Sequence, residues 1–179
     1  MTNYRRNFTD GGTHFFTVNI ADRSKSLLTD HIHILSDAFR YVSQRHPFVT
    51  NAIVVLPDHL HPIWTLHEND RDYPLRWRLI KTMFSRGIEQ GEPLSNSRIG
   101  KGERGIWQRR YWEHTIKDEI DYARHVDYIH FNPVKHRHVS RAGDWPHSSF
   151  HRFVKARAFS NDWAGAHESE ALEFGERNA

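Results

Sequence analysis

The chain of 179 residues contains no cysteine. Disulfide bonds, cysteine-ligated zinc and iron–sulfur clusters are therefore excluded, because each of them needs thiol groups. Long apolar runs are also missing, and the first residues, MTNYRRNFTDGG, have no apolar stretch of the kind that signal peptides carry. We therefore expect a soluble, cytoplasmic protein with no membrane partner.

Neither sign of charge dominates the chain. It has 25 Lys and Arg against 22 Asp and Glu, so its formal net charge of +3 permits a nucleic-acid partner without requiring one. Hydrophobic residues make up 37% and charged residues 26%, which is a globular composition. The length suits one domain, which we place at residues 1–157, followed by a polar tail at 158–179. The chain is rich in histidine, with 15, and in tryptophan, with 6.

The hydrophobic pattern predicts alternating strands and helices. Strands are expected at 13–20, 47–57, 59–66 and 106–116, and helices at 24–45, 72–90, 117–136 and, after a turn, within 144–157. The order β-α-β-β-α-β is that of the ferredoxin-like split βαβ fold, in the α+β class, with helices on one face of an antiparallel sheet.

Three residues refine these expected boundaries. Ser24 is a suitable N-cap for the first helix. Pro62 argues that the third strand lies at a sheet edge or carries a bulge, because proline cannot donate to a neighbouring strand. Pro133 is expected to end the third helix near Asn132.

The segment VVLPDHLHPIWTL, residues 54–66, carries two histidines on one strand. His59 and His61 point to the same side, about 6.5–7 Å apart along the chain, while Leu60 points to the other layer. Two imidazoles at this spacing can lean onto one metal ion, at about 2.1 Å each. Alternatively, both lie on an open, solvated sheet face and bind nothing.

The helix expected at 117–136 has two different faces. Its apolar side should face the core and holds Ile120, Ala123, Val126, Phe131 and Val134. The opposite arc carries Tyr128, with Asn132 one turn later and Asp121 two turns earlier. The alternative is a solvated helix face with a partly exposed surface tyrosine. If this arc meets the histidine pair, however, a phenol nucleophile lies beside a metal site.

Three segments together resemble the REP-associated tyrosine transposases, a branch of the single-tyrosine HUH transposases. They are PDHLHPIWTL, IWQRRYWEH and HVDYIHFNPVKH, and the resemblance covers most of the chain, with the motifs in the order of the family. It implies a ferredoxin-like HUH nuclease that acts on single-stranded DNA and on folded palindromic repeats. His59 and His61 match the HUH histidines, Tyr128 matches the nucleophile on a C-terminal helix, and Asn132 matches the residue that completes the metal site.

This resemblance implies a specific reaction. Tyr128 would take a 5′ phosphate, leave a 3′ hydroxyl and later rejoin strands, as a transposase and DNA strand transferase does. Two imidazoles and an amide oxygen lead us to expect Mg²⁺ or Mn²⁺ as cofactor, with Mn²⁺ the tighter of the two. The expected partners are single-stranded DNA and DNA hairpins in the nucleoid, bound by a monomer or a homodimer.

A DNA surface of this kind should combine basic and aromatic side chains. Taken singly, each such residue has an ordinary alternative, either as a surface charge or as a core aromatic. The basic candidates are Arg5, Arg6, Arg78, Lys81, Arg109, Arg110 and Arg152, joined by Arg76, Arg86 and Lys155, with Trp77, Trp107, Tyr111 and Trp112 for stacking on bases.

Two rival functions remain open at this point. In the first, the chain is a metal-dependent hydrolase that activates water at His59 and His61, with Asp58 or Asp121 as base and Tyr128 purely structural. In the second, it is a non-catalytic DNA-hairpin-binding protein, whose binding would survive loss of the tyrosine, the histidines and the metal.

Overall fold

The computed structural model describes residues 10–92, 94 and 96–163. Four strands form one sheet: β1 (Thr13–Asn19), β2 (Val49–Val55), β3 (His59–Thr65) and β4 (Trp112–Thr115). Their spatial order is β2-β3-β1-β4, and every neighbouring pair is antiparallel. This order is that of the split βαβ arrangement, so the predicted α+β class is confirmed.

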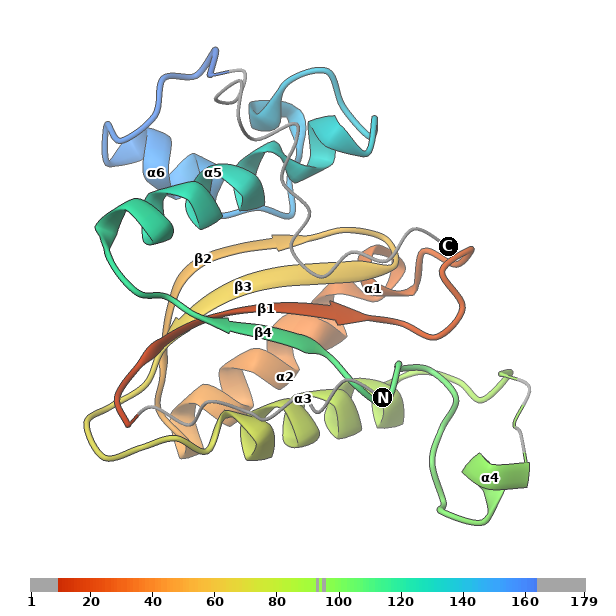
Figure 1. Cartoon of the computed structure of the whole chain (residues 1–179). Coiled ribbons are helices and arrows are strands. Elements are labelled where there is room, and N and C mark those ends of the chain that lie inside the picture. Colours follow the sequence, from red (N-terminus) through yellow and green to blue (C-terminus); the bar gives the residue numbers. More distant parts are fainter. Residues whose placement is uncertain (1–9, 93, 95, 164–179) are drawn as a thin grey trace, which may run out of the picture.

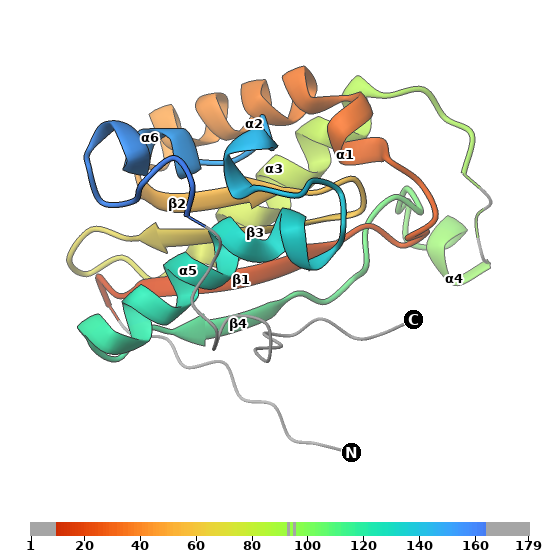
Figure 2. The same cartoon turned by 90° about the horizontal axis from the view of Figure 1, so that it is seen from above.

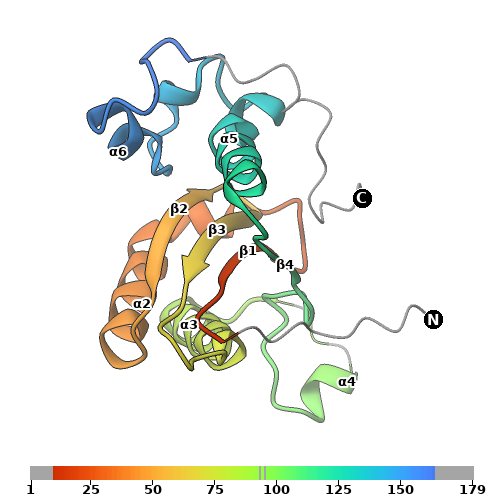
Figure 3. The same cartoon turned by 60° about the vertical axis from the view of Figure 1, so that its left-hand side comes forward.

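Helices cover both faces of this sheet. They are α1 (Leu27–Asp30), α2 (Ile32–Arg45), α3 (Tyr73–Gly87), α4 (Asn96–Ile99), α5 (Glu119–Lys135) and α6 (Phe150–Lys155), with a 3₁₀ turn η1 (Ala142–Asp144). Figures 1 and 3 show α2 and α3 against one face and α5 against the other. Seen from above in Figure 2, α5 lies across the sheet, and α6 follows on the side of β2 and α2. No helix among the described residues is long and apolar enough to cross a membrane.

Strand β1 shows why both faces are covered. Phe16 and Val18 belong to the cluster formed with α2 and α3, where the rings of Trp64 and Trp77 stack at 4.3 Å. Phe15 points the other way, into the cluster formed with α5. Both faces of the strand are therefore apolar, as expected of a strand buried on both sides.

Pro62 was expected to mark a sheet edge or a bulge, and the edge alternative is wrong. Strand β3 is internal, between β2 and β1. Paired residues flank the proline in the β1–β3 ladder, with Phe15 opposite Ile63 and Val18 opposite Leu60. A register shift in β2 also lies close to the residue that faces Pro62. The bulge alternative is closer to the structure, because β2 shifts its register beside the residues that pair with Pro62 and Ile63.

Three predicted element boundaries also need correction. Ser24 donates its hydroxyl to Asp22 at 2.6 Å instead of capping a helix. The first predicted helix is broken at His31 into α1 and α2. Pro133 does not end the third helix, because α5 continues to Lys135. A proline in the last turn removes a single backbone hydrogen bond, which the helix can lose.

The expected orientation of α5 is only partly correct. Val126 and Phe131 are buried as predicted, but Ile120 is 68% exposed. Tyr128 and Asn132, assigned to the solvated side, are buried, and so is His125. The amphipathic pattern misleads here because this helix covers polar side chains of the sheet as well as apolar ones.

The end of the described chain folds back onto the domain. The rings of Phe159 and Trp163 lie 5.7 and 5.8 Å from the ring of Phe150 in α6. Residues 164–179 of the predicted tail lie outside the described residues.

Candidate functional site

The histidine pair of β3 is buried beneath α5. His59 is 1% and His61 0% exposed, and their ring centroids are 4.9 Å apart. The expected open sheet face is therefore wrong, because α5 covers it. Nδ1 of His59 lies 2.7 Å from Oδ1 of Asp58, and Nδ1 of His61 lies 3.0 Å from the hydroxyl of Thr17. Hydrogen bonds through Nδ1 leave the two Nε2 atoms as the ones that can bind a metal.

Asp58 is itself held in place by a cation. Arg23 donates from Nε to Oδ2 of Asp58 at 2.6 Å. Burial alone would raise the pKa of the Asp58 carboxyl, but hydrogen bonds and charges from His59 and Arg23 hold it well below its usual range. The carboxylate is therefore charged at neutral pH and orients the imidazole. The sequence motif PDHLH places Asp58 next to the pair, a signal for this orienting role.

Tyr128 of α5 lies directly against the pair. Its ring centroid is 5.3 Å from that of His61 and 6.0 Å from that of Phe15. The side chain is 1% exposed, so the predicted partly exposed tyrosine is a buried one. The ammonium of Lys135, two turns later on the helix, lies 4.8 Å from the centre of the phenol ring.

Asn132 lies between two residues that contact the histidine pair. Residues spaced by four share one side of a helix, so Tyr128, Asn132 and His136 form one stripe. Tyr128 contacts His61, and the ring of His136 lies 5.1 Å from that of His59. Asn132 is fully buried in the middle of this stripe. The strand and the helix meet as predicted. His136 was not among the predicted site residues, although its spacing of four from Asn132 indicates that it lies on the same side.

These donors suit a divalent ion. His59, His61 and Asn132 offer two imidazoles and an amide oxygen, a set that accepts Mn²⁺ and, more weakly, Mg²⁺. The Nδ1 atoms of both imidazoles already have hydrogen-bond partners, as the second nitrogen of a metal-binding histidine does in protein metal sites. The predicted ligands therefore fit the predicted cofactor.

Asp121 lies elsewhere on the helix. Its Oδ2 accepts hydrogen bonds from the backbone amide of Lys117 at 2.9 Å and pairs with Nε2 of His114 at 2.8 Å. It is seven residues from Tyr128, or about 10 Å along the helix axis. Of the two bases considered for a hydrolase, only Asp58 adjoins the histidine pair.

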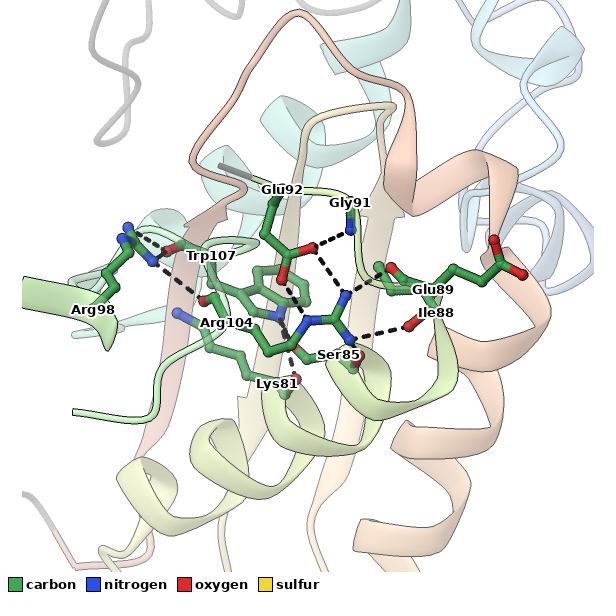
Figure 4. Close-up of polar contacts among 9 residues, drawn as sticks. All are labelled: Lys81, Ser85, Ile88, Glu89, Gly91, Glu92, Arg98, Arg104 and Trp107. Carbon is green, nitrogen blue, oxygen red and sulfur yellow. Dashed lines mark hydrogen bonds and ion pairs between the residues drawn. The ribbon is translucent and has the colours of Figure 1, made fainter. Parts of the chain in front are cut away.

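A basic groove of about 600 Å³ lies beside α3, on the opposite face of the sheet from Tyr128. It runs between α3 and the segment 98–111, and Figure 4 shows the contacts that join the two. Arg104 pairs with Glu92 and also donates to backbone carbonyls at the end of α3. The basic residues that line the groove are Arg78, Lys81, Arg86, Arg98, Arg104 and Arg109.

Lys81 lies at the centre of this groove. Its ammonium donates to the carbonyl of Gln108 at 3.2 Å and lies 5.4 and 5.3 Å from the ring centres of Trp107 and Tyr111. Burial lowers the pKa of Lys81 to about 8. Arg78 and Arg86 are exposed on the same helix, so their charges face solvent.

The other proposed DNA residues are scattered. Arg5 and Arg6 lie outside the described residues, and Arg110 is exposed next to the groove. Arg152 is on α6, away from the groove, and donates to the carbonyl of Thr50 at 3.1 Å. Arg76 and Trp77 are core residues, 2% and 1% exposed, so they are not available to DNA.

Known proteins resemble this chain over almost its whole length, although no protein-family model matches it. A REP-associated tyrosine transposase of Escherichia coli (strain K12) is 46% identical over 165 residues, which are 92% of this chain and 92% of that protein. A Haemophilus influenzae protein with the same family name is 48% identical over 166 residues, 92% and 94% of the two chains. A solved REP-associated tyrosine transposase bound to a REP hairpin has a TM-score of 0.85 and 44% identity, over 100% of this chain and 99% of that one. The predicted resemblance is confirmed, and the chain belongs to the REP-associated tyrosine transposases.

Proposed function

We propose that this transposase cleaves and rejoins single-stranded DNA beside hairpin-forming repeats, through a covalent 5′-phosphotyrosine at Tyr128. The observation that carries the proposal is the contact between a phenol and a histidine pair whose Nδ1 atoms are already held. The hairpin in the complex of the 44% identical relative supports the substrate class. With such a substrate, we expect the protein to act at the nucleoid.

The reaction follows from what the chain's own residues can do. The phenol oxygen of Tyr128 attacks phosphorus, the bond from phosphorus to the 3′ oxygen breaks, and the 5′ phosphate stays on the tyrosine. The phenol proton leaves, and the departing 3′ oxygen takes up a proton. Because the ester bond is conserved in the adduct, the 3′ hydroxyl of another strand can reverse the step. That reversal joins strands, which a hydrolytic nuclease does not do.

His59, His61 and Asn132 hold the divalent ion in this proposal. When bound, Mg²⁺ or Mn²⁺ supplies positive charge that polarises the phosphodiester. Asp58 and Thr17 keep the two imidazoles oriented for this purpose.

Lys135 assists the nucleophile. A free phenol has a pKa of about 10, so little of it is ionised at neutral pH. A positive charge close to the ring favours the phenolate. The Lys135 ammonium, 4.8 Å from the ring centre of Tyr128, meets that requirement.

The basic groove beside α3 contacts DNA phosphates in this proposal. Arg78 and Arg86 are exposed there, and Lys81 adds a charge between two aromatic rings. Such grooves follow a nucleic-acid backbone and let bases stack on exposed ring faces. The protein acts as a monomer or as a homodimer, and measuring the mass of the protein–DNA complex distinguishes the two.

Replacing Tyr128 with phenylalanine tests the nucleophile. We expect Tyr128→Phe to lose cleavage of a labelled hairpin with a single-stranded flank, together with the denaturant-resistant protein–DNA adduct that the parent should form with Mn²⁺. The ring still fills its buried place, so loss of the hydroxyl should cost about 1–3 kcal/mol of unfolding free energy. Tyr122→Phe on the same helix is the matched control and should cleave normally.

The alternatives give different results in the same assay. A hydrolase that activates water would keep cutting as Tyr128→Phe and would never form an adduct. A pure hairpin binder would cut in neither form. Either result contradicts the proposed mechanism, provided that circular dichroism shows the protein to be folded.

A further inference from the structure

A second group of ligand-type side chains lies where β4 meets the start of α5. It consists of His114 on the strand and Asp121 and His125 on the helix. Each residue offers one potential ligand atom, and these atoms all lie within 4.8 Å of one another. Nε2 of His114 is 2.8 Å from Oδ2 of Asp121. Nδ1 of His125 is 3.1 Å from Oδ1 of Asp121 but donates to the backbone carbonyl of Asp121 at 2.8 Å, which leaves Nε2 as the nitrogen of His125 that can bind an ion.

This group is distinct from the histidine pair of β3. The ring of Phe15 lies between them, with its centroid 4.8 Å from that of His125 and 5.4 Å from that of His61. An ion at one group would therefore not share ligands with the other. The proposed DNA chemistry does not use His114, Asp121 or His125.

The geometry of the group is close to that of a metal site. Zinc ligands lie about 2.0–2.2 Å from the ion, so ligand atoms in a tetrahedral site are about 3.3–3.5 Å apart. The contact of 2.8 Å between His114 and Asp121 is slightly shorter, and all three potential ligand atoms lie within 4.8 Å of one another, so side-chain rotations can bring them to that spacing. The two imidazole rings stack, with centroids 4.7 Å apart and planes inclined by 13°, so one ring has to turn for both ring planes to meet at a shared ion.

Exposure and support also suit a bound ion. The His114 and Asp121 side chains are 25% and 20% exposed, whereas His125 is 1% exposed. One side is thus open to solvent, where water can complete the coordination, and the other is fixed in the protein. The amide of Lys117 donates to Oδ2 of Asp121 and orients the carboxylate.

We propose that His114, Asp121 and His125 form a second metal site, which takes Zn²⁺ or a similar transition-metal ion. Two imidazoles and one carboxylate are a ligand set that zinc uses in proteins. The ion would join edge strand β4 to the first turns of α5, the helix that carries Tyr128. Its role is to hold that helix on the sheet.

The test measures zinc itself, with no DNA present. We titrate the metal-free full chain with ZnCl₂ by calorimetry and count the bound ions by elemental analysis after gel filtration. The parent should bind one more Zn²⁺ per chain than His114→Gln, and the corresponding binding step should weaken at least tenfold. Zinc should also raise the melting temperature of the parent more than that of the variant.

Two further variants make the result decisive. Asp121→Asn keeps an oxygen that can accept from Lys117, so it should fold, and it should lose the same zinc ion. His33→Gln removes an exposed histidine of α2 and should bind as much zinc as the parent. Equal stoichiometry in the parent, His114→Gln and Asp121→Asn overturns the proposal. An equal loss in His33→Gln also overturns it, because the zinc would then be held by scattered surface histidines.

Discussion

At the scale of single residues, the site depends on groups that orient the histidines as much as on the histidines themselves. Asp58 and Thr17 each hold one Nδ1 atom, and Arg23 anchors Asp58. The pattern His-x-His identifies the pair from sequence because strand residues two apart share a face. Thr17 comes from a different strand, so only the register of β1 against β3 brings it to His61. Burial of the pair was likewise not predictable, since it depends on where α5 packs.

The orienting role of Asp58 leads to a prediction about metal affinity. Asp58→Asn removes the charge that favours the Nδ1–H of His59 but keeps a similar shape. We expect Mn²⁺ to bind about 10- to 100-fold more weakly, as happens when such outer partners are changed. Calorimetric titration with MnCl₂ measures this. Asp37→Asn, which alters an exposed pair with Arg40 on α2, is the control. Unchanged Mn²⁺ affinity in Asp58→Asn would show that His59 needs no such partner.

A second residue-scale prediction concerns Lys135. Lys135→Met keeps most of the side-chain length but removes the charge beside the phenol of Tyr128. We expect cleavage at pH 7 to fall about tenfold, which corresponds to losing about 1.4 kcal/mol of charge stabilisation in the transition state. The deficit should shrink at pH 9.5, where more phenol ionises without help. Single-turnover rates at the two pH values decide the matter. An equal loss at both would mean that Lys135 serves packing or DNA binding instead.

At the scale of elements, local patterns predict which segments are strands and helices, but not how they are placed. The β-branched and aromatic runs identify the four strands because their side chains suit a pleated, buried surface. Pro62 was assigned to an edge or a bulge because its missing donor is a local property. Which of the two applies depends on the order of strands, a property of the whole sheet. Ile120 was assigned to the core because the apolar arc of a helix usually faces inward. In α5 that rule fails where the helix covers the polar site.

The groove beside α3 gives an element-scale prediction of pH dependence. Folded Lys81 has a pKa of about 8, against an ordinary value of 10.5. Its charge, and one phosphate contact, should therefore be lost as the pH rises through 8. At 0.1 M salt one contact to a single strand is worth about fivefold in affinity. Fluorescence anisotropy of labelled hairpin DNA between pH 7 and 9 should show this loss in the parent.

Lys81→Arg is the matched variant for this experiment, because arginine stays charged throughout that range. Its affinity should not change between pH 7 and 9. The stability of the parent should change in the opposite direction to its DNA affinity. Between about 8 and 10.5 the unfolded chain holds a proton that the folded chain has released, so the unfolding free energy of the parent rises with pH. A parent affinity that stays flat to pH 9 would rule out a phosphate contact by Lys81.

At the scale of the whole molecule, the sheet separates two surfaces to which we assign different tasks. Tyr128 and the histidine pair lie between the sheet and α5, while the basic groove lies beside α3 on the other side (Figure 1). A substrate that uses both must pass around an edge of the sheet, and β4 is the edge next to the segment 98–111 that lines the groove. A hairpin with a single-stranded flank has two parts that can reach the two surfaces.

This division predicts that binding and cleavage respond differently to charge removal in the groove. Arg78→Gln with Arg86→Gln should remove two phosphate contacts, since both arginines are exposed there. The slope of log affinity against log salt should then become shallower by roughly 1.4 to 1.8, at 0.7 to 0.9 per phosphate. Under saturating DNA the cleavage rate should stay near that of the parent, because Tyr128 and its site are untouched. Arg40→Gln removes an exposed charge on α2, outside the groove, and should leave the slope as it is. If the double variant keeps the parent's salt slope, hairpin DNA binds elsewhere. If it binds DNA normally but cuts it slowly, the groove serves catalysis and the two surfaces are not separate.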